Sequence, residues 1–195
     1  MSEIERRAFV VEGLRIEKRE DGKGAKLRGH GAVFKELREE LGGFREKILP
    51  GEFADAIERD DVRALFNHEP NFVLGRNRSK TLTLSEDARG LAIEIDIPDS
   101  QTVRDLVTMP IERGDVSQMS FGFSVRPGGQ DWAKDDEGRV IRTLKKLRLF
   151  DISPVTFPAY PQTDVAVREL RSFQQSQAPK VPMNLIRAKD MLAQI

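Results

Sequence analysis

A serine in the middle of residues 115–125 (DVSQMSFGFSV) is the side chain whose chemistry stands out most in this sequence. Successive side chains of a strand alternate between its two faces. One face would therefore carry Ser117, Met119, Phe121, Phe123 and Val125, and the other Val116, Gln118, Ser120, Gly122 and Ser124. The first face is bulky and largely apolar, so we expect it to be buried. The second narrows to small residues around Ser120, and a glycine inside a strand often marks the close approach of a ligand or another backbone. These features suit a nucleophile, although a solvated face that carries two serines by chance is the alternative.

A serine hydroxyl needs a base to become nucleophilic near neutral pH, and the chain has two histidines. His68 ends the predicted strand ALFNH and begins the loop EPNFVLGR, where a polar side chain can line a cleft. His30 lies between two glycines in LRGHGAVF, inside an early strand. We therefore predict that His68 is the general base and that His30 has a structural role.

An acid that could orient this base lies in the segment LRLFDISPVTFPAYP. Asp151 interrupts an apolar strand there, and simple alternation puts it on the same face as Leu149. A buried carboxylate without a partner is costly. Asp151 should therefore either fix the tautomer of His68 or pair with an arginine, and the sequence leaves both open. We expect Ser153 and residues 154–161 to line the neighbouring cleft wall.

The composition excludes several other classes of site. The 195 residues contain 32 Lys and Arg and 32 Asp and Glu, so a net charge of zero predicts no broad attraction to nucleic acid or membrane. The absence of cysteine excludes disulfides, thiolate catalysis and cysteine-type zinc sites, and two histidines without a clustered acid pattern argue against any metal. We expect no cofactor. The start, MSEIERRAFVVEG, lacks the apolar core of a signal peptide, so we expect a soluble, cytoplasmic protein.

Short strands are expected to position these residues. The patterns predict strands at residues 8–19, 25–35, 62–68, 81–84 and 91–97, helices at residues 53–59 and 100–113, a polar hairpin tip at residues 127–138, and a strand pair that reaches residue 152. Residues 21–24 should form the turn between the first two strands. Ser100 is a suitable N-cap and Gly114 a suitable stop for the longer helix, which Pro110 should kink or end.

Many short strands and few helices predict a mainly β protein with flanking helices (α+β), arranged as a small, closed or nearly closed antiparallel β-barrel. Residues 1–171 would form the single catalytic domain. The Gln-, Ser- and Pro-rich residues 172–182 look like a linker, and residues 184–195 have the apolar spacing of a short amphipathic helix. We therefore predict a tail at residues 172–195.

Six segments, in order, carry a resemblance to a known family: GHGAVF, PGEF, LFNHEPNFVLGR, LTLSEDARGLAIEIDIPDS, ERGDVSQMSFGFSV and DISPVTFPAYPQT. Together, over about residues 28–163, the chain resembles the prohead (capsid maturation) proteases of tailed bacteriophages, serine endopeptidases related in fold to the herpesvirus assemblins. The resemblance implies that Ser120 is the nucleophile, His68 the base and Asp151 the third member. Assemblins have a second histidine at that third place, whereas this chain offers an acid.

The resemblance also implies an assemblin-like fold and a function. The enzyme would cleave scaffold or propeptide segments of the major capsid protein inside the immature capsid, in the host cytoplasm. Its partners would be the major capsid protein and the scaffold segment, with self-cleavage of the tail and a homo-oligomer as further expectations. Two alternatives are an inactive, barrel-shaped assembly factor and a hydrolase of small esters or amides. Acyl transfer needs donors to an oxyanion, and the loop around Arg76 and Arg78 or the turn at residues 153–155 could supply them.

Overall fold

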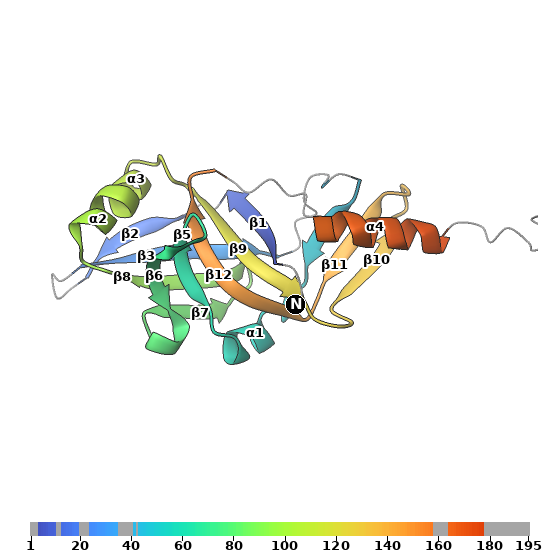
Figure 1. The fold of residues 1–195 in the computed structure, drawn as a ribbon, viewed down its shortest axis with the longest axis horizontal. Coiled ribbons are helices and arrows are strands. Elements are labelled where there is room, and N and C mark those ends of the chain that lie inside the picture. Colours follow the sequence, from blue (N-terminus) through green and yellow to red (C-terminus); the bar gives the residue numbers. More distant parts are fainter. Residues whose placement is uncertain are drawn as a thin grey trace, which may run out of the picture. The chain divides into compact units, whose positions relative to one another are not determined.

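Strands dominate the computed structural model, which describes residues 4–10, 13–19, 24–34, 41, 43–157 and 164–177 (Figure 1). A five-stranded sheet has the order β1 (Glu5–Val10), β9 (Gln118–Val125), β12 (Leu147–Val155), β5 (Arg63–Phe66) and β6 (Glu69–Arg76). A four-stranded sheet has the order β2 (Arg15–Lys18), β3 (Ala25–Val33), β8 (Gly90–Ile97) and β7 (Leu82–Glu86). A three-stranded sheet consists of β10 (Gln130–Lys134), β11 (Val140–Leu144) and β4 (Arg45–Ile48).

The described helices are short apart from the last one. They are α1 (Ala54–Arg59), the 3₁₀ turn η1 (Asn77–Ser79), α2 (Gln101–Val103), the π-helical turn η2 (Arg104–Thr108), α3 (Met109–Glu112) and α4 (Asp164–Gln177). The predicted mainly β fold with a few helices is thus confirmed. The predicted closed antiparallel barrel is not, because the pairings among the described strands give three sheets and two of these pairings, β12 with β5 and β11 with β4, are parallel.

The helix predicted at residues 100–113 is present but irregular. Ser100 caps it by accepting a hydrogen bond from the Val103 N–H at 3.3 Å, and the helix ends before Gly114, whose φ is +83°. Pro110 was predicted to kink or end this helix, and the irregularity is the π-helical turn η2, which ends two residues before it. Proline has no N–H to donate, and the Thr108 hydroxyl bonds to backbone carbonyls one turn earlier in the helix.

A single apolar core supports the strand that carries Ser120. Met119, Phe121 and Phe123, on one face of β9, are fully buried and belong to the same cluster as Leu27 of β3 and Ile95 of β8. Each such side chain contributes roughly 1.5–3 kcal/mol to folding. The five-stranded sheet therefore packs on the four-stranded one, and β9 is a firmly held strand.

Four buried charges join the five-stranded sheet to the three-stranded one. Arg7 of β1 bonds to Glu5 (2.9 Å) and to Glu46 of β4 (2.6 Å), and Arg142 of β11 bonds to the same two carboxylates at 2.7 and 3.0 Å. Burial alone would raise the pKa of Glu5, but the bonds and charges of Arg142 and Arg7 outweigh it and lower that pKa. Burial likewise would lower the pKa of Arg7, and Glu46 and Glu5 raise it. The four charges balance one another.

Several sequence-based boundaries differ from the structure. Residues 8–19 do not form one strand, since β1 pairs with β9 and the separate strand β2 forms the predicted hairpin with β3. The turn residues 21–23 of that hairpin lie outside the described residues. Strand β10 occupies much of the predicted polar tip, and the tight turn follows it, with the Gly138 N–H bonded to the Asp135 carbonyl. The segment QDWAK lacks a regular alternation of polar and apolar residues, so the sequence pattern did not mark this strand.

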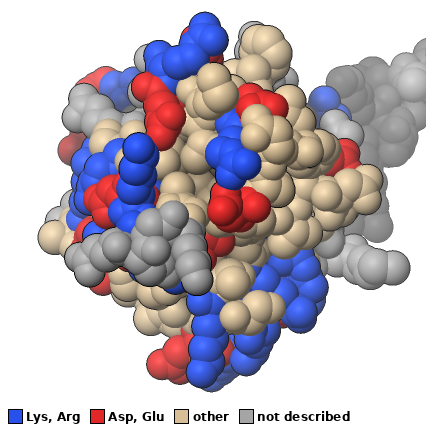
Figure 2. Space-filling view, turned by 90° about the vertical axis from the view of Figure 1, so that its left-hand side faces the viewer, with Lys and Arg blue, Asp and Glu red and all other residues tan. Residues whose placement is uncertain are grey.

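The chain divides into two compact units after Thr163. Helix α4 runs to Gln177, so residues 172–177 are helical where we predicted a linker. The rest of the predicted linker and the predicted terminal helix, residues 178–195, lie outside the described residues. No helix among the described residues is long and apolar enough to span a membrane. On the face shown in Figure 2, basic and acidic side chains are interspersed.

Candidate active site

Ser120 lies on the central part of a strand that is paired on both sides. In β9 it is opposite Ala8 of β1 and opposite Ser153 of β12, and it is fully buried. The predicted alternation holds from Gln118 onward, because Met119, Phe121 and Phe123 face the core. The strand begins later than predicted, however: Ser117 precedes it and is exposed rather than buried. The small-residue face around Ser120 is therefore rigidly positioned by two neighbouring strands.

His68 occupies the tip of the hairpin between β5 and β6. Asn67 and His68 form a two-residue turn with φ values of +53° and +59°, as in a type I′ turn. Non-glycine residues in this region cost on the order of 1–3 kcal/mol, so neighbouring contacts must hold them there. Asn67 supplies such contacts: its N–H bonds to the Pro154 carbonyl (3.0 Å), and its side chain exchanges hydrogen bonds with Thr156 at 3.1 and 2.8 Å. The turn is thus fastened to the end of β12.

A β-bulge decides which way Asp151 points. Leu149 is opposite Phe123 on the core face of β9, whereas Asp151, two residues later, is opposite Gly122 on the Ser120 face. Phe150 is the extra residue at this register shift. Our prediction that Asp151 shares a face with Leu149 is therefore wrong, because alternation assumes an uninterrupted strand. The bulge therefore turns the carboxylate from the core face to the face that carries Ser120.

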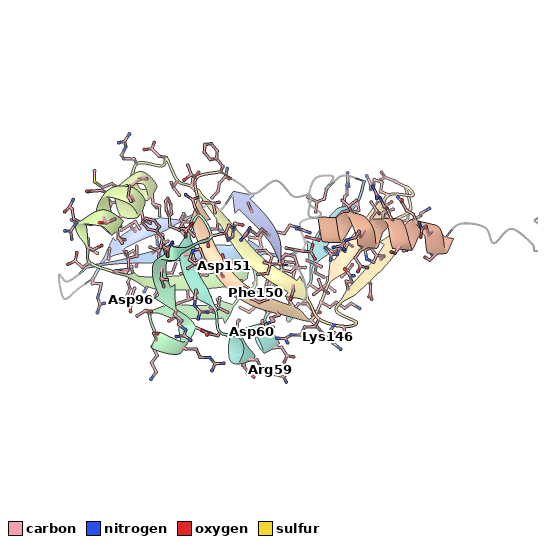
Figure 3. The ribbon with its side chains drawn as sticks, in the orientation of Figure 1. Arg59, Asp60, Asp96, Lys146, Phe150 and Asp151 are labelled. Carbon is pink, nitrogen blue, oxygen red and sulfur yellow. The ribbon has the colours of Figure 1, made fainter. Side chains whose placement is uncertain are left out.

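The bulge has its own buried support in Asp60, which follows α1 (Figure 3). One oxygen of Asp60 accepts the Leu149 N–H at 2.9 Å, directly before the extra residue. The other oxygen accepts a hydrogen bond from Arg126 at 2.6 Å, and Arg126 also donates to the Leu147 carbonyl at 3.2 Å. A backbone N–H that an irregular ladder leaves unpaired thus has a charged acceptor.

These elements bring the three predicted residues together in one chain of hydrogen bonds. His68 Nε2 lies 2.7 Å from Ser120 Oγ, and His68 Nδ1 lies 2.5 Å from Asp151 Oδ2. The side chains of His68 and Asp151 are 9% and 10% exposed, which leaves the pair poorly screened by water. An arginine partner for Asp151, the alternative left open by the sequence, is not among its described contacts. With these hydrogen bonds His68 can accept the proton of Ser120, and Asp151 can stabilise the imidazolium that results.

Two further residues shape the carboxylate's position. Ser153, fully buried, donates a hydrogen bond of 2.7 Å to the same Asp151 oxygen that meets His68. Gly122 lies under the other oxygen: a Cβ at this position would lie 2.4 Å from Asp151 Oδ1. No side chain larger than hydrogen fits there without moving the carboxylate. The sequence suggested that Gly122 makes room for a ligand or another backbone. In the structure it makes room for the Asp151 carboxylate.

The other sequence candidates lie apart from this site. His30 of β3, in the four-stranded sheet, bonds to Asp87 at 2.9 Å. Arg76 pairs with Asp61 at 2.6 Å, and this bond, together with the nearby charges, lowers the pKa of Asp61 to about 2. Arg76 is opposite Arg63, at the far end of the β5–β6 hairpin from His68. The loop around Arg76 and Arg78 is therefore wrongly placed to supply oxyanion donors.

Comparisons with known proteins identify the family of the chain. The family of caudovirus prohead serine proteases matches residues 12–178, most of the chain. The chain belongs to this family. Among solved structures, the bacteriophage T4 capsid assembly protease, gp21, is similar in fold with a TM-score of 0.50 and 11% sequence identity, over 77% of this chain and 98% of that one. No curated protein matches the chain. The chain is accordingly a prohead serine protease.

Sequence reasoning missed two residues that support the three in this protease, Asn67 and Asp60, and placed Ser153 only in the cleft wall. Asn67 and Asp60 act through contacts with partners 89 residues away, and no periodicity marks them. One signal was available for Asn67, since asparagine tolerates positive φ and favours the first position of tight hairpin turns. The segment LFNHEP carries that signal, but we took residues 62–68 as a continuous strand.

Proposed function

We propose that Ser120 is the nucleophile of this serine protease, His68 its general base and Asp151 the acid that orients His68. The observation that carries the proposal is the continuous relay from Asp151 Oδ2 through the imidazole to Ser120 Oγ, with separations of 2.5 and 2.7 Å. Both lie within or at the edge of the range in which a base acts on its nucleophile. For this role Nδ1 carries the imidazole proton and donates a hydrogen bond to Asp151, which leaves Nε2 free to accept a hydrogen bond from the Ser120 hydroxyl.

The reaction is an acyl transfer in two halves. Ser120 Oγ attacks the peptide carbonyl carbon while its proton passes to His68 Nε2, and the carbonyl oxygen becomes an oxyanion. His68 then gives that proton to the departing amine, the C–N bond breaks, and an acyl-enzyme remains. In the second half a water molecule loses a proton to His68 and attacks the ester carbonyl. Return of the proton to Ser120 Oγ releases the carboxylic acid product and restores the enzyme.

The substrate follows from the family rather than from the geometry. We infer that the protease cleaves scaffold or propeptide segments of the major capsid protein inside the immature capsid. The same reasoning suggests that the protein assembles beside the capsid protein in the host cytoplasm. Self-cleavage of the tail, assembly into a homo-oligomer, an assemblin-like fold and a catalytic domain that ends near residue 171 stay predictions.

The alternatives are less well supported. An assembly factor that has lost catalysis would be under no constraint to keep a nucleophile, a base and an acid in hydrogen-bonded order, with Gly122 and Ser153 fitted around the acid. A hydrolase of small esters would share the relay, but the family match over residues 12–178 favours a peptide substrate.

The deciding experiment is coexpression of the protease with the major capsid protein of the same genome, followed by gel and mass analysis. Wild-type protease should shorten the capsid protein at defined positions, and Ser120→Ala should leave it intact while folding normally. Ser124→Ala is the matched control, because Ser124 lies on the same strand face, is also buried, and lies on the far side of Gly122 from Ser120. Processing by Ser120→Ala at the wild-type rate would refute the proposal.

A further inference from the structure

The backbone of the strand that carries Ser120 has no free N–H to stabilise the oxyanion. Many serine hydrolases use the backbone N–H of the nucleophile or its neighbour, which requires that these groups be free. In this protein β9 is a central strand, and residues 118–123 are paired with β1 on one side and β12 on the other. Every N–H of a doubly paired strand is taken up by one ladder or the other. The donor must come from a side chain or from another segment.

Residues 153–155, the other segment that the sequence suggested as a source of oxyanion donors, have few N–H groups to offer. Residues 153–155 belong to β12 and are paired with residues 118–120 of β9. Pro154 has no N–H, and its carbonyl already accepts the Asn67 N–H at 3.0 Å. A side-chain donor beside Ser120 is therefore the better source.

The relay runs along β9, and this direction points to one residue. Asp151 lies over Gly122, and His68 spans from Asp151 to Ser120. Gln118 is the next side chain on the same face, two residues before Ser120. It lies on the side of Ser120 away from His68. Residues two apart in a strand are separated by roughly 6.5–7 Å, which is within reach of a glutamine amide. His68 must later protonate the leaving amine, so the oxyanion and its donor need a side of Ser120 that the base does not occupy.

Gln118 also has an unmet hydrogen-bonding capacity. Its Oε1 atom is buried and has no hydrogen-bond partner among the residues that the structure describes. A buried polar atom without a partner costs roughly 1–3 kcal/mol, and such atoms in native proteins call for an explanation. A substrate that lies over Ser120 would supply partners: its carbonyl oxygen can accept from the Gln118 amide N–H, and a substrate N–H can donate to Oε1.

We propose that Gln118 is a catalytic residue of this protease, whose side-chain amide donates a hydrogen bond to the oxyanion formed when Ser120 attacks. The proposal rests on the function proposed for Ser120. An amide donor does not titrate, so it acts equally across the working pH range. It bonds more strongly to the oxyanion than to the neutral carbonyl, so it accelerates the chemical step more than it tightens substrate binding.

The test uses purified full-length protein and a synthetic peptide that spans a junction cleaved in the coexpression experiment. Wild-type protein is compared with Gln118→Ala, Gln118→Glu and the control Ser124→Ala in single-turnover and steady-state assays. Removal of one oxyanion donor typically lowers kcat by about 10²–10³. We expect that loss in Gln118→Ala, with KM changed less than threefold and both limbs of the pH profile unmoved. A peptide boronic acid, which mimics the tetrahedral adduct, should lose affinity by a similar factor.

Gln118→Glu separates catalysis from packing. It keeps the volume of glutamine but replaces the donor with a negative charge, so it should be slower than Gln118→Ala, whereas a purely structural role predicts near wild-type turnover. Turnover of Gln118→Ala within threefold of wild type would overturn this inference alone. A wild-type protein that shows neither Ser120-dependent turnover nor Ser120-dependent labelling by a fluorophosphonate would overturn the proposed function, and this inference with it.

Discussion

Replacement of Gly122 by alanine should disable the protease without altering any member of the relay. The new methyl carbon would lie 2.4 Å from Asp151 Oδ1, whereas ordinary contacts of this kind begin near 3.4 Å. The carboxylate must therefore retreat by about 1 Å. The bond between Asp151 Oδ2 and His68 Nδ1, now 2.5 Å, would lengthen to about 3.5 Å, where a hydrogen bond is lost.

Misplacement of a catalytic group by 1 Å costs about 10²-fold in rate, and complete loss of the aspartate's function about 10⁴-fold. We therefore expect kcat/KM of Gly122→Ala to fall between these limits. Overpacking should also lower the free energy of unfolding by about 1–3 kcal/mol. A peptide-cleavage assay, with thermal unfolding measured in parallel, gives both quantities.

Gly75→Ala is the matched control. Its Cβ would lie 2.6 Å from the Thr81 carbonyl oxygen, a comparable clash at a position remote from His68. This variant should lose stability but keep kcat/KM per folded molecule. Wild-type activity in Gly122→Ala would refute the reasoning, because it would mean that the contact between Asp151 and Gly122 does not hold the carboxylate in its working position.

Three other predictions concern the base, the acid and the buried charges. His68→Ala should be as inactive as Ser120→Ala, and the double variant no worse than either, while His30→Ala should affect only the unfolding temperature; an essential His30 would contradict the assignment. Asp151→Asn should lower kcat about 10⁴-fold with little change in the circular dichroism spectrum, and wild-type kcat would rule out the orienting role. Glu46→Gln leaves a buried arginine charge unbalanced and should cost about 3–5 kcal/mol in urea unfolding; a change below 1 kcal/mol would contradict the buried network.

The buried charges also predict a pH dependence of stability. Because the pKa of Glu5 is lowered in the folded protein, the unfolded chain binds its proton more readily. The stabilisation is therefore present above the ordinary glutamate pKa of about 4.3 and is lost as the pH falls below it. The free energy of unfolding in urea, measured from pH 6 to pH 3, should decrease over that interval. A flat profile would contradict the assignment.

Local sequence determined much of the scaffold. Alternation of large and small residues predicted the two faces of β9 from Gln118 onward, because a strand's side chains alternate whatever it pairs with. Turn and capping residues likewise predicted the β2–β3 hairpin and the Ser100 cap. The candidates Ser120, His68 and Asp151 could be selected because the chain has two histidines and one acid within that apolar strand.

Only the tertiary structure decided how these residues meet. His68 is 52 residues from Ser120 and 83 from Asp151, and its imidazole reaches both because a turn with positive φ is fastened to the end of β12. Asp151 lies on the face of Ser120 because a bulge reverses the alternation of β12. The acceptor that supports this bulge, Asp60, is 89 residues from Leu149. A strand's period is a property of its own backbone, whereas register shifts depend on pairing partners that the local sequence does not contain.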